Sequence, residues 1–122
     1  MKETIVAVLA AGERCHCTDR FQSAIQPLLF ALARHDNAVV NRVLIELSTY
    51  RFGVANGEIY HCILQRRGLT VVKQLTSKTL KNDCVQRFGA KSSLCLSDAE
   101  RKDVADSVVR AIKAGSKCDI EY

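Results

Sequence analysis

Apolar side chains recur every three to four residues along most of this 122-residue chain, which is the spacing of one face of an α-helix. Residues 3–14 predict a short apolar helix, with a buried strand as the alternative. A second helix is expected after Thr18 and Asp19, which offer an N-cap, and Pro27 predicts a kink or a later start. The apolar face of this second helix comprises Phe21, Ile25, Leu28, Leu29 and Leu32.

Three more helical segments are expected in the middle of the chain. Asp36 is placed to cap a strongly apolar helix that ends before Gly53. Residues 58–67 predict another helix, which Gly68 ends. Residues 69–81 continue the helical pattern, although several threonines weaken it because β-branching lowers helix propensity.

The last helix has the clearest predicted boundaries. Ser97 and Glu100 form a capping box, in which each side chain accepts a hydrogen bond from a free backbone amide, and Gly115 suits the position after the helix. Residues 82–96 form the longest irregular segment. Short connections favour antiparallel neighbours. The pattern therefore predicts one all-α domain spanning residues 1–122, an irregular antiparallel bundle of about five to six helices.

Six cysteines without zinc-finger spacing suggest disulfide staples in this domain: Cys15, Cys17, Cys62, Cys84, Cys95 and Cys118. Each crosslink would add roughly 2–4 kcal/mol of stability, and paired cysteines are typical of extracytoplasmic proteins. Cys84–Cys95 is the preferred pair because it closes the irregular segment, and Cys118 is expected to reach Cys15, Cys17 or Cys62. Six reduced thiols, some in the core, are the alternative. Pairing favours a periplasmic location, and free thiols favour the cytoplasm.

The sequence offers few candidates for metal or catalytic chemistry. Cys15-His16-Cys17 and His61-Cys62 carry soft ligands, but residues two apart on a helix point to nearly opposite sides, and no Cys-x₂₋₄-Cys knuckle is present. A Cys–His catalytic pair is also disfavoured, because neighbours such as His61 and Cys62 face apart on a helix. We therefore expect no metal, no cofactor, no catalytic residues and no enzymatic activity.

The net charge of +5 bears only on the kind of partner that the protein could bind. The basic residues form a solvated surface or a docking face for an acidic partner. The basic residues are not interleaved with aromatic residues, and no recognition motif is present. We therefore expect no nucleic-acid partner. The densest basic group comprises Arg66, Arg67, Lys73, Lys78, Lys81, Arg87 and Lys91.

The apolar run at residues 5–11 is too short to span a bilayer, so no membrane association is expected. It resembles the core of a signal peptide, but Glu3 stands where a basic residue belongs. We interpret the run as the first buried element of the fold, and removal of a natural leader stays open.

The last third of the chain resembles bacterial immunity proteins. The residues concerned are Leu94-Cys95-Leu96-Ser97-Asp98-Ala99-Glu100-Arg101, then Ile112-Lys113-Ala114-Gly115 and Cys118. Helical, cysteine-bearing immunity proteins neutralise toxins of type VI secretion or contact-dependent inhibition systems. The resemblance implies non-enzymatic binding to one cognate toxin. Because inhibitors of nucleases are expected to be acidic, a net charge of +5 fits a toxin with an acidic contact face better.

Aromatic and arginine side chains are the usual anchors of protein interfaces, which predicts a contact face at Tyr50, Arg51, Tyr60, Arg66 and Arg67. Tyrosines buried in the core are the alternative interpretation. We also expect that alanine at Arg66 and Arg67 weakens partner binding without unfolding the domain.

A small secreted carrier of an apolar ligand is the rival function, and an enzyme comes third. A carrier predicts a closed pocket. An inhibitor predicts a filled core and an exposed patch with anchors, and an enzyme predicts titratable groups that converge in a cleft. The carrier cavity would be lined by Phe30, Leu32, Ile45 and Leu47.

Overall fold

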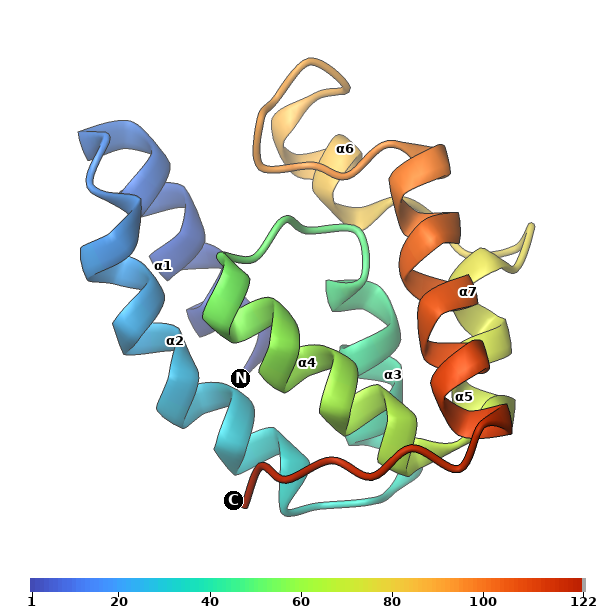
Figure 1. Ribbon diagram of the computed structural model, residues 1–122. Coiled ribbons are helices and arrows are strands. Elements are labelled where there is room, and N and C mark those ends of the chain that lie inside the picture. Colours follow the sequence, from blue (N-terminus) through green and yellow to red (C-terminus); the bar gives the residue numbers. More distant parts are fainter. Residues whose placement is uncertain (122) are drawn as a thin grey trace.

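The computed structural model describes residues 1–121, and this part of the chain is all-α, with no strand. Its helices form an irregular bundle rather than a set of equal repeats (Figure 1). The elements are α1 (Lys2–Cys15), α2 (Thr18–Ala33), α3 (Ala38–Leu47), α4 (Val54–Arg67), α5 (Leu69–Val72), the 3₁₀ turn η1 (Lys73–Thr76), α6 (Asp83–Phe88) and α7 (Asp98–Lys113).

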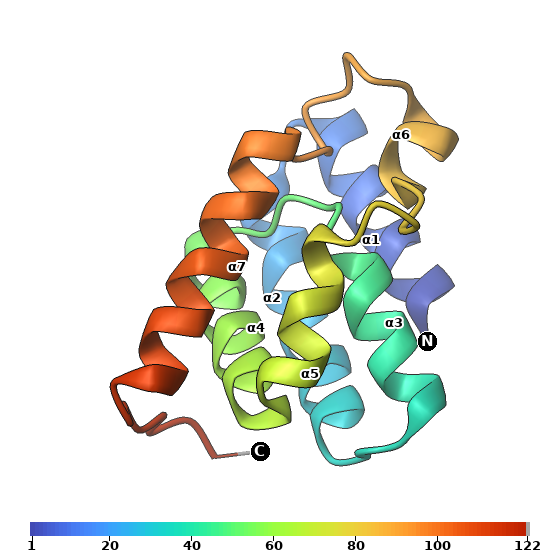
Figure 2. The ribbon, with the colours of Figure 1, turned by 90° about the vertical axis from the view of Figure 1, so that its right-hand side faces the viewer.

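The helices lie in two layers. α1 and α2 form an antiparallel hairpin, and α4 packs between α2 and α7 (Figure 1). α3 and α5 lie side by side behind α4 and α7, as the rotated view shows (Figure 2). α6 caps one end of the molecule, and the C-terminal tail crosses the other end below α4 (Figure 1).

The core lies between these layers. Its fully buried side chains come from α1 to α6, η1 and the α3–α4 connection. The apolar run at residues 5–11 lies in α1, so it is part of a helix and not of a strand. Of the side chains considered for a carrier cavity, Leu32, Ile45 and Leu47 belong to this core and Phe30 packs against it. The core includes Ile5, Ile25, Leu29, Leu44, Leu47, Ile63 and Leu64.

Local signals set several helix boundaries. The capping box of α7 forms as the sequence predicts, with Glu100 N donating to Ser97 Oγ at 3.1 Å and Ser97 N donating to Glu100 Oε1 at 3.0 Å. Gly68 ends α4 and Gly115 follows α7, both with positive φ. The cap of α3 is Asn37, whose Oδ1 accepts from Val40 N at 2.9 Å, and not Asp36.

Other boundaries also differ from the sequence prediction, including that of α2, whose N-cap is Cys17 and not Thr18 or Asp19. Gly53 begins α4 instead of ending the preceding helix, because its extended backbone supplies the N-cap. The predicted helix at residues 69–81 stops at Thr76 after a short α-turn and a 3₁₀ turn. The segment expected to be irregular contains α6, which Asn82 caps through its side chain.

The six cysteines form three pairs. Cys84 bonds Cys95, which is the pair that the sequence favours, and Cys118 bonds Cys62. Cys15 bonds Cys17, a pairing that the sequence analysis does not single out. It forms where α1 ends at Cys15, because His16 adopts a left-handed conformation that turns the chain before Cys17.

Candidate functional site

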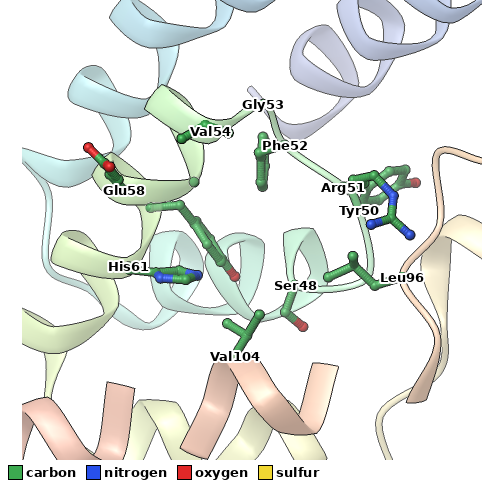
Figure 3. Close-up of a pocket in the computed structure, with 12 residues that line it drawn as sticks. Ser48, Tyr50, Arg51, Phe52, Gly53, Val54, Glu58, His61, Leu96 and Val104 are labelled. Carbon is green, nitrogen blue, oxygen red and sulfur yellow. The ribbon is translucent and has the colours of Figure 1, made fainter. Parts of the chain in front are cut away.

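An open cavity of about 350 Å³ lies between the α3–α4 connection, the first turns of α4 and α7 (Figure 3). We call it the α4 groove. Its apolar lining comes from Phe52 and Val54 on one side and from Leu96 and Val104 on the other. Val54 is 85% exposed at the rim. The groove therefore presents apolar surface to solvent.

The wall of the groove is tied to the segment before α7 by backbone hydrogen bonds. Arg51 N donates to Leu94 O at 2.8 Å, and Leu96 N donates to Thr49 O at 3.0 Å. These bonds flank an isolated antiparallel bridge between Tyr50 and Cys95. Because the bridge adjoins the Cys84–Cys95 disulfide, the connection is fixed at both backbone and covalent levels.

Arg51 reinforces this attachment from outside. Its Nη1 and Nη2 donate to the two carboxylate oxygens of Glu100 at 2.8 and 3.0 Å, and its Nε donates to Ser93 O at 3.2 Å. The bidentate contact lowers the pKa of Glu100 to about 2. Arg51 is exposed, but its donors are already engaged, so it positions the groove wall.

The two tyrosines of the predicted contact face are buried. Tyr50 Oη donates to Asp83 Oδ2 at 2.5 Å, and Tyr60 Oη donates to Leu44 O at 2.5 Å. Burial raises the pKa of both phenols, and the hydrogen bond to Asp83 raises that of Tyr50 further. Tyr60 also stacks on Phe52, with ring centroids 5.2 Å apart. The tyrosines line the groove from within and are not protruding anchors.

The polar groups of the groove do not form a catalytic constellation. Ser48 Oγ donates to Ile45 O at 2.6 Å, so its hydroxyl proton is engaged. Burial lowers the pKa of His61, which favours the neutral imidazole. His61 points toward the hollow and Glu58 points away from it (Figure 3). This arrangement suits an apolar group with a polar contact at one edge.

Arg66 and Arg67 lie at the other end of α4 and do not line the groove. Arg66 Nη2 donates to Cys118 O at 3.0 Å and to Ile120 O at 2.6 Å, which holds the C-terminal tail. Arg67 Nη2 donates to three carbonyls at the end of α2, including His35 O at 2.7 Å. The Arg67 side chain is only 6% exposed, so alanine there would destabilise the fold. The double alanine variant at Arg66 and Arg67 would therefore lose buried hydrogen bonds as well as any partner contact, so it does not separate binding from stability.

The predicted basic group divides into two kinds of residue. Arg67 pairs with Asp36, and Arg87 pairs with Glu3 and Asp83. By contrast, four exposed lysines make no ion pair with any side chain of residues 1–121: Lys73, Lys78, Lys81 and Lys91. These lysines lie on or beside η1 and α6, and Asp98 and Asp106 line the same hollow as Lys78.

Among residues 1–121, no three His, Cys, Asp or Glu side chains converge as ligands for a metal ion. His61 and Cys62 do not join Cys15-His16-Cys17, because all these cysteines are engaged in disulfides. In the same part of the chain, no helix combines the length and the apolar character that a bilayer crossing requires.

Sequence reasoning found Tyr50, Arg51 and Tyr60, which the structure does bring together, but it missed the apolar lining. Phe52 and Val54 follow a tyrosine and an arginine around Gly53, and this apolar pair beside a glycine was the available signal. A Cβ at Gly53 would lie 3.1 Å from the Gln22 side chain, so the connection packs closely against α2. Leu96 and Val104 carry no local signal because they reach the groove only through tertiary packing.

Comparison with known proteins adds no relative. No family model, curated protein or solved structure matches the chain. Function is therefore inferred from the groove, the disulfides and the distribution of charge.

Proposed function

We propose that this protein is a non-enzymatic inhibitor of the bacterial immunity type, which neutralises a cognate toxin by direct binding through the α4 groove. The observation that carries the proposal is an exposed apolar groove on a covalently braced scaffold. Its walls are fixed by the Tyr50–Cys95 bridge and the Arg51–Glu100 contact. A rigid binding surface loses little conformational entropy on association, which favours tight complexes.

The groove supports a protein partner over a carried small ligand. It opens to solvent, whereas the side chains that would line an enclosed carrier cavity are packed in or against the core. Its volume suits one or two side chains of a partner. Val54 extends the exposed apolar surface beyond the hollow, and a contiguous exposed apolar patch is typical of a protein-interaction site.

The bound segment that best fits the groove is an apolar side chain from an acidic loop of the toxin. Phe52, Leu96 and Val104 would contact the apolar group. The positive charge of the chain, including the exposed lysines near η1 and α6, would attract an acidic partner over a distance and speed association.

Three cysteine pairs support an oxidising location such as the periplasm. A toxin that acts in or passes through that compartment would meet the inhibitor there. A cytoplasmic inhibitor would instead keep these cysteines reduced.

The proposal is tested with a pair of exposed valines that differ in location. Val54→Asp places a charge at the groove rim, and Val39→Asp places the same charge on α3, where the valine is 76% exposed and does not line the groove. The measurement is calorimetric affinity for the toxin encoded beside the gene, with growth protection as a second readout. We expect Val54→Asp to weaken binding by about tenfold or more and Val39→Asp to leave it unchanged.

Arg66→Ala tests the competing location at the other end of α4, and it spares the buried Arg67. We expect it to leave affinity for the toxin unchanged. If Arg66→Ala weakens binding and Val54→Asp does not, the contact face lies at the C-terminal end of α4 and the groove is not the site. If the purified toxin binds neither the native protein nor any variant, the immunity function itself is wrong.

A further inference from the structure

The Cys15–Cys17 disulfide closes a very small ring at the turn between α1 and α2. The two cysteines are two positions apart, with Cα atoms separated by 5.2 Å. His16, between them, has φ 55° and ψ 34°. His16 N donates to Glu13 O at 3.3 Å and Cys17 N donates to Gly12 O at 3.1 Å, which is the Schellman pattern that ends a helix. The ring thus encloses a left-handed residue that is not glycine.

This disulfide differs from the other two in access. Cys15 and His16 are exposed and Cys17 is partly buried, at a turn on the edge of the molecule (Figure 1). Cys84, Cys95 and Cys62 are all buried and Cys118 is partly buried, so Cys15 is the exposed cysteine among the six. A thiol from solution can therefore approach the first pair without any opening of the fold. Exposed disulfides are generally the labile or reactive ones.

The two sulfurs of the exposed pair are not equivalent. Cys17 is the N-cap residue of the 16-residue helix α2, and no side chain caps that helix. The backbone carbonyl of Cys17 accepts from Phe21 N at 3.4 Å. A thiolate on Cys17 would lie at the positive end of the helix, near amides that lack a capping side chain. Cys17 is consequently the better leaving group, and Cys15 is the more accessible sulfur.

We propose that Cys15–Cys17 is a thiol–disulfide exchange site that accepts two electrons from an accessible dithiol, such as a reduced cysteine pair of another protein. A thiolate of the dithiol attacks Cys15 Sγ, and the Sγ–Sγ bond breaks with its electron pair on Cys17. The second thiolate of the dithiol then attacks the dithiol's own sulfur in the mixed disulfide, and Cys15 leaves as a thiolate. The dithiol becomes a disulfide, and both released protein thiolates can take up protons from solvent.

The N-cap position also favours the reduced product. In the disulfide, Cys17 Sγ makes no capping hydrogen bond to α2, whereas a free thiolate can accept one. Reduction therefore allows Cys17 to cap the N-terminus of α2, and it also opens the short disulfide ring. Both effects stabilise the dithiol form and make the pair a better oxidant than Cys84–Cys95.

The first test compares the three pairs within one native molecule, so it needs no variant. The protein is mixed with reduced glutathione or with a reduced dithiol peptide, quenched with an alkylating agent and mapped by mass spectrometry. We expect Cys15–Cys17 to be reduced at least about tenfold faster than Cys84–Cys95, with the glutathione adduct on Cys15. Equal rates for the pairs, or an adduct on Cys17, would overturn the proposal.

The two reductants also separate the sources of the thiol. Reaction with the peptide but not with glutathione assigns the site to protein dithiols, and reaction with both assigns it to thiols in general. Reaction with neither overturns the site. The Cys15→Ser/Cys17→Ser variant keeps the other two disulfides and serves as the matched control. It should lose oxidation of the dithiol peptide, and retained oxidation would show that another pair reacts.

Discussion

Two disulfide-bonded regions of this protein, the Cys15–Cys17 turn and the Cys84–Cys95 segment, contain the same bond in opposite surroundings. The first closes a ring over a sequence separation of 2 at an exposed turn. The second closes a loop over a separation of 11, with both cysteines buried. A short loop removes little freedom from the unfolded chain, whereas a longer loop removes more. The bond at the turn is therefore placed for reaction, and the buried bond is placed for stability.

The neighbours of each pair extend this contrast. Thr49 Oγ1 accepts from Cys84 N at 3.2 Å, and the Tyr50 ring meets Phe88 edge-on with centroids 6.4 Å apart. The buried disulfide thus joins a network that also forms the wall of the α4 groove. At the turn, the contacts are those of the backbone that ends α1. Loss of the buried bond should disturb both stability and the groove, and loss of the exposed bond should disturb neither strongly.

Removal of the buried disulfide is expected to have the largest effect. Cys84→Ala/Cys95→Ala should lower the free energy of unfolding by about 3 kcal/mol, because the closed loop is regained by the unfolded chain. The measurement is urea unfolding followed by circular dichroism, with the slope m compared to the native protein. A loss of unfolding free energy smaller than that of Cys15→Ala/Cys17→Ala would contradict the contrast between the two regions.

Tyr50→Phe should produce the next largest effect. It removes the hydroxyl that donates to Asp83 at 2.5 Å and leaves the ring contact with Phe88. Asp83 keeps its contacts with Lys2 at 3.3 Å and Arg87 at 3.1 Å, so its carboxylate stays paired. We expect a loss of about 1.5 kcal/mol in the free energy of unfolding, measured by thermal and urea denaturation. A neutral result would mean that these ion pairs alone hold α6 against the groove wall.

Removal of the exposed disulfide is expected to cost less stability than removal of the buried one. Cys15→Ala/Cys17→Ala should cost about 1.5 kcal/mol of unfolding free energy, since the ring is short. Cys15→Ala/Cys17→Ser should recover about 1 kcal/mol of that loss, because serine can cap α2 where the disulfide does not. Urea unfolding of the two variants side by side measures the difference. Identical stabilities would show that position 17 cannot cap the helix and would weaken the argument for Cys17 as leaving group.

The parts of the fold that sequence could predict are those that local chemistry determines. The Ser97–Glu100 capping box acts within one turn, so the start of α7 followed directly from the residues. Gly53 is ambiguous, because glycine suits both the end of one helix and the cap of the next. Only the packing of the connection against Gln22 settles that it begins α4.

The candidate site was less predictable, for reasons of distance and backbone geometry. Tyr50 and Tyr60 were identified by residue type, but residue type does not reveal that their hydroxyls are satisfied inside the protein. Val104 reaches the groove only through tertiary packing. The Cys15–Cys17 bond depends on a left-handed histidine, a conformation for which the sequence carries no glycine signal.

The smallest expected effect concerns the outer edge of the buried-disulfide region, where Arg51 holds Glu100. The pKa of Glu100 falls from an ordinary 4.5 to about 2 in the folded protein. A lowered carboxyl pKa contributes stability that is complete above pH 4.5 and is lost as pH falls toward 2.

Glu100→Gln can keep the capping box but loses the charge, so its stability should depend less on pH across this window. Both partners are exposed, so the difference should be small and should shrink in high salt. Arg51→Gln should flatten the same part of the profile, as measured by urea unfolding at stepped pH. Native and Glu100→Gln profiles that coincide between these pH values would show that the disulfide and the Tyr50–Cys95 bridge hold the groove wall without this ion pair.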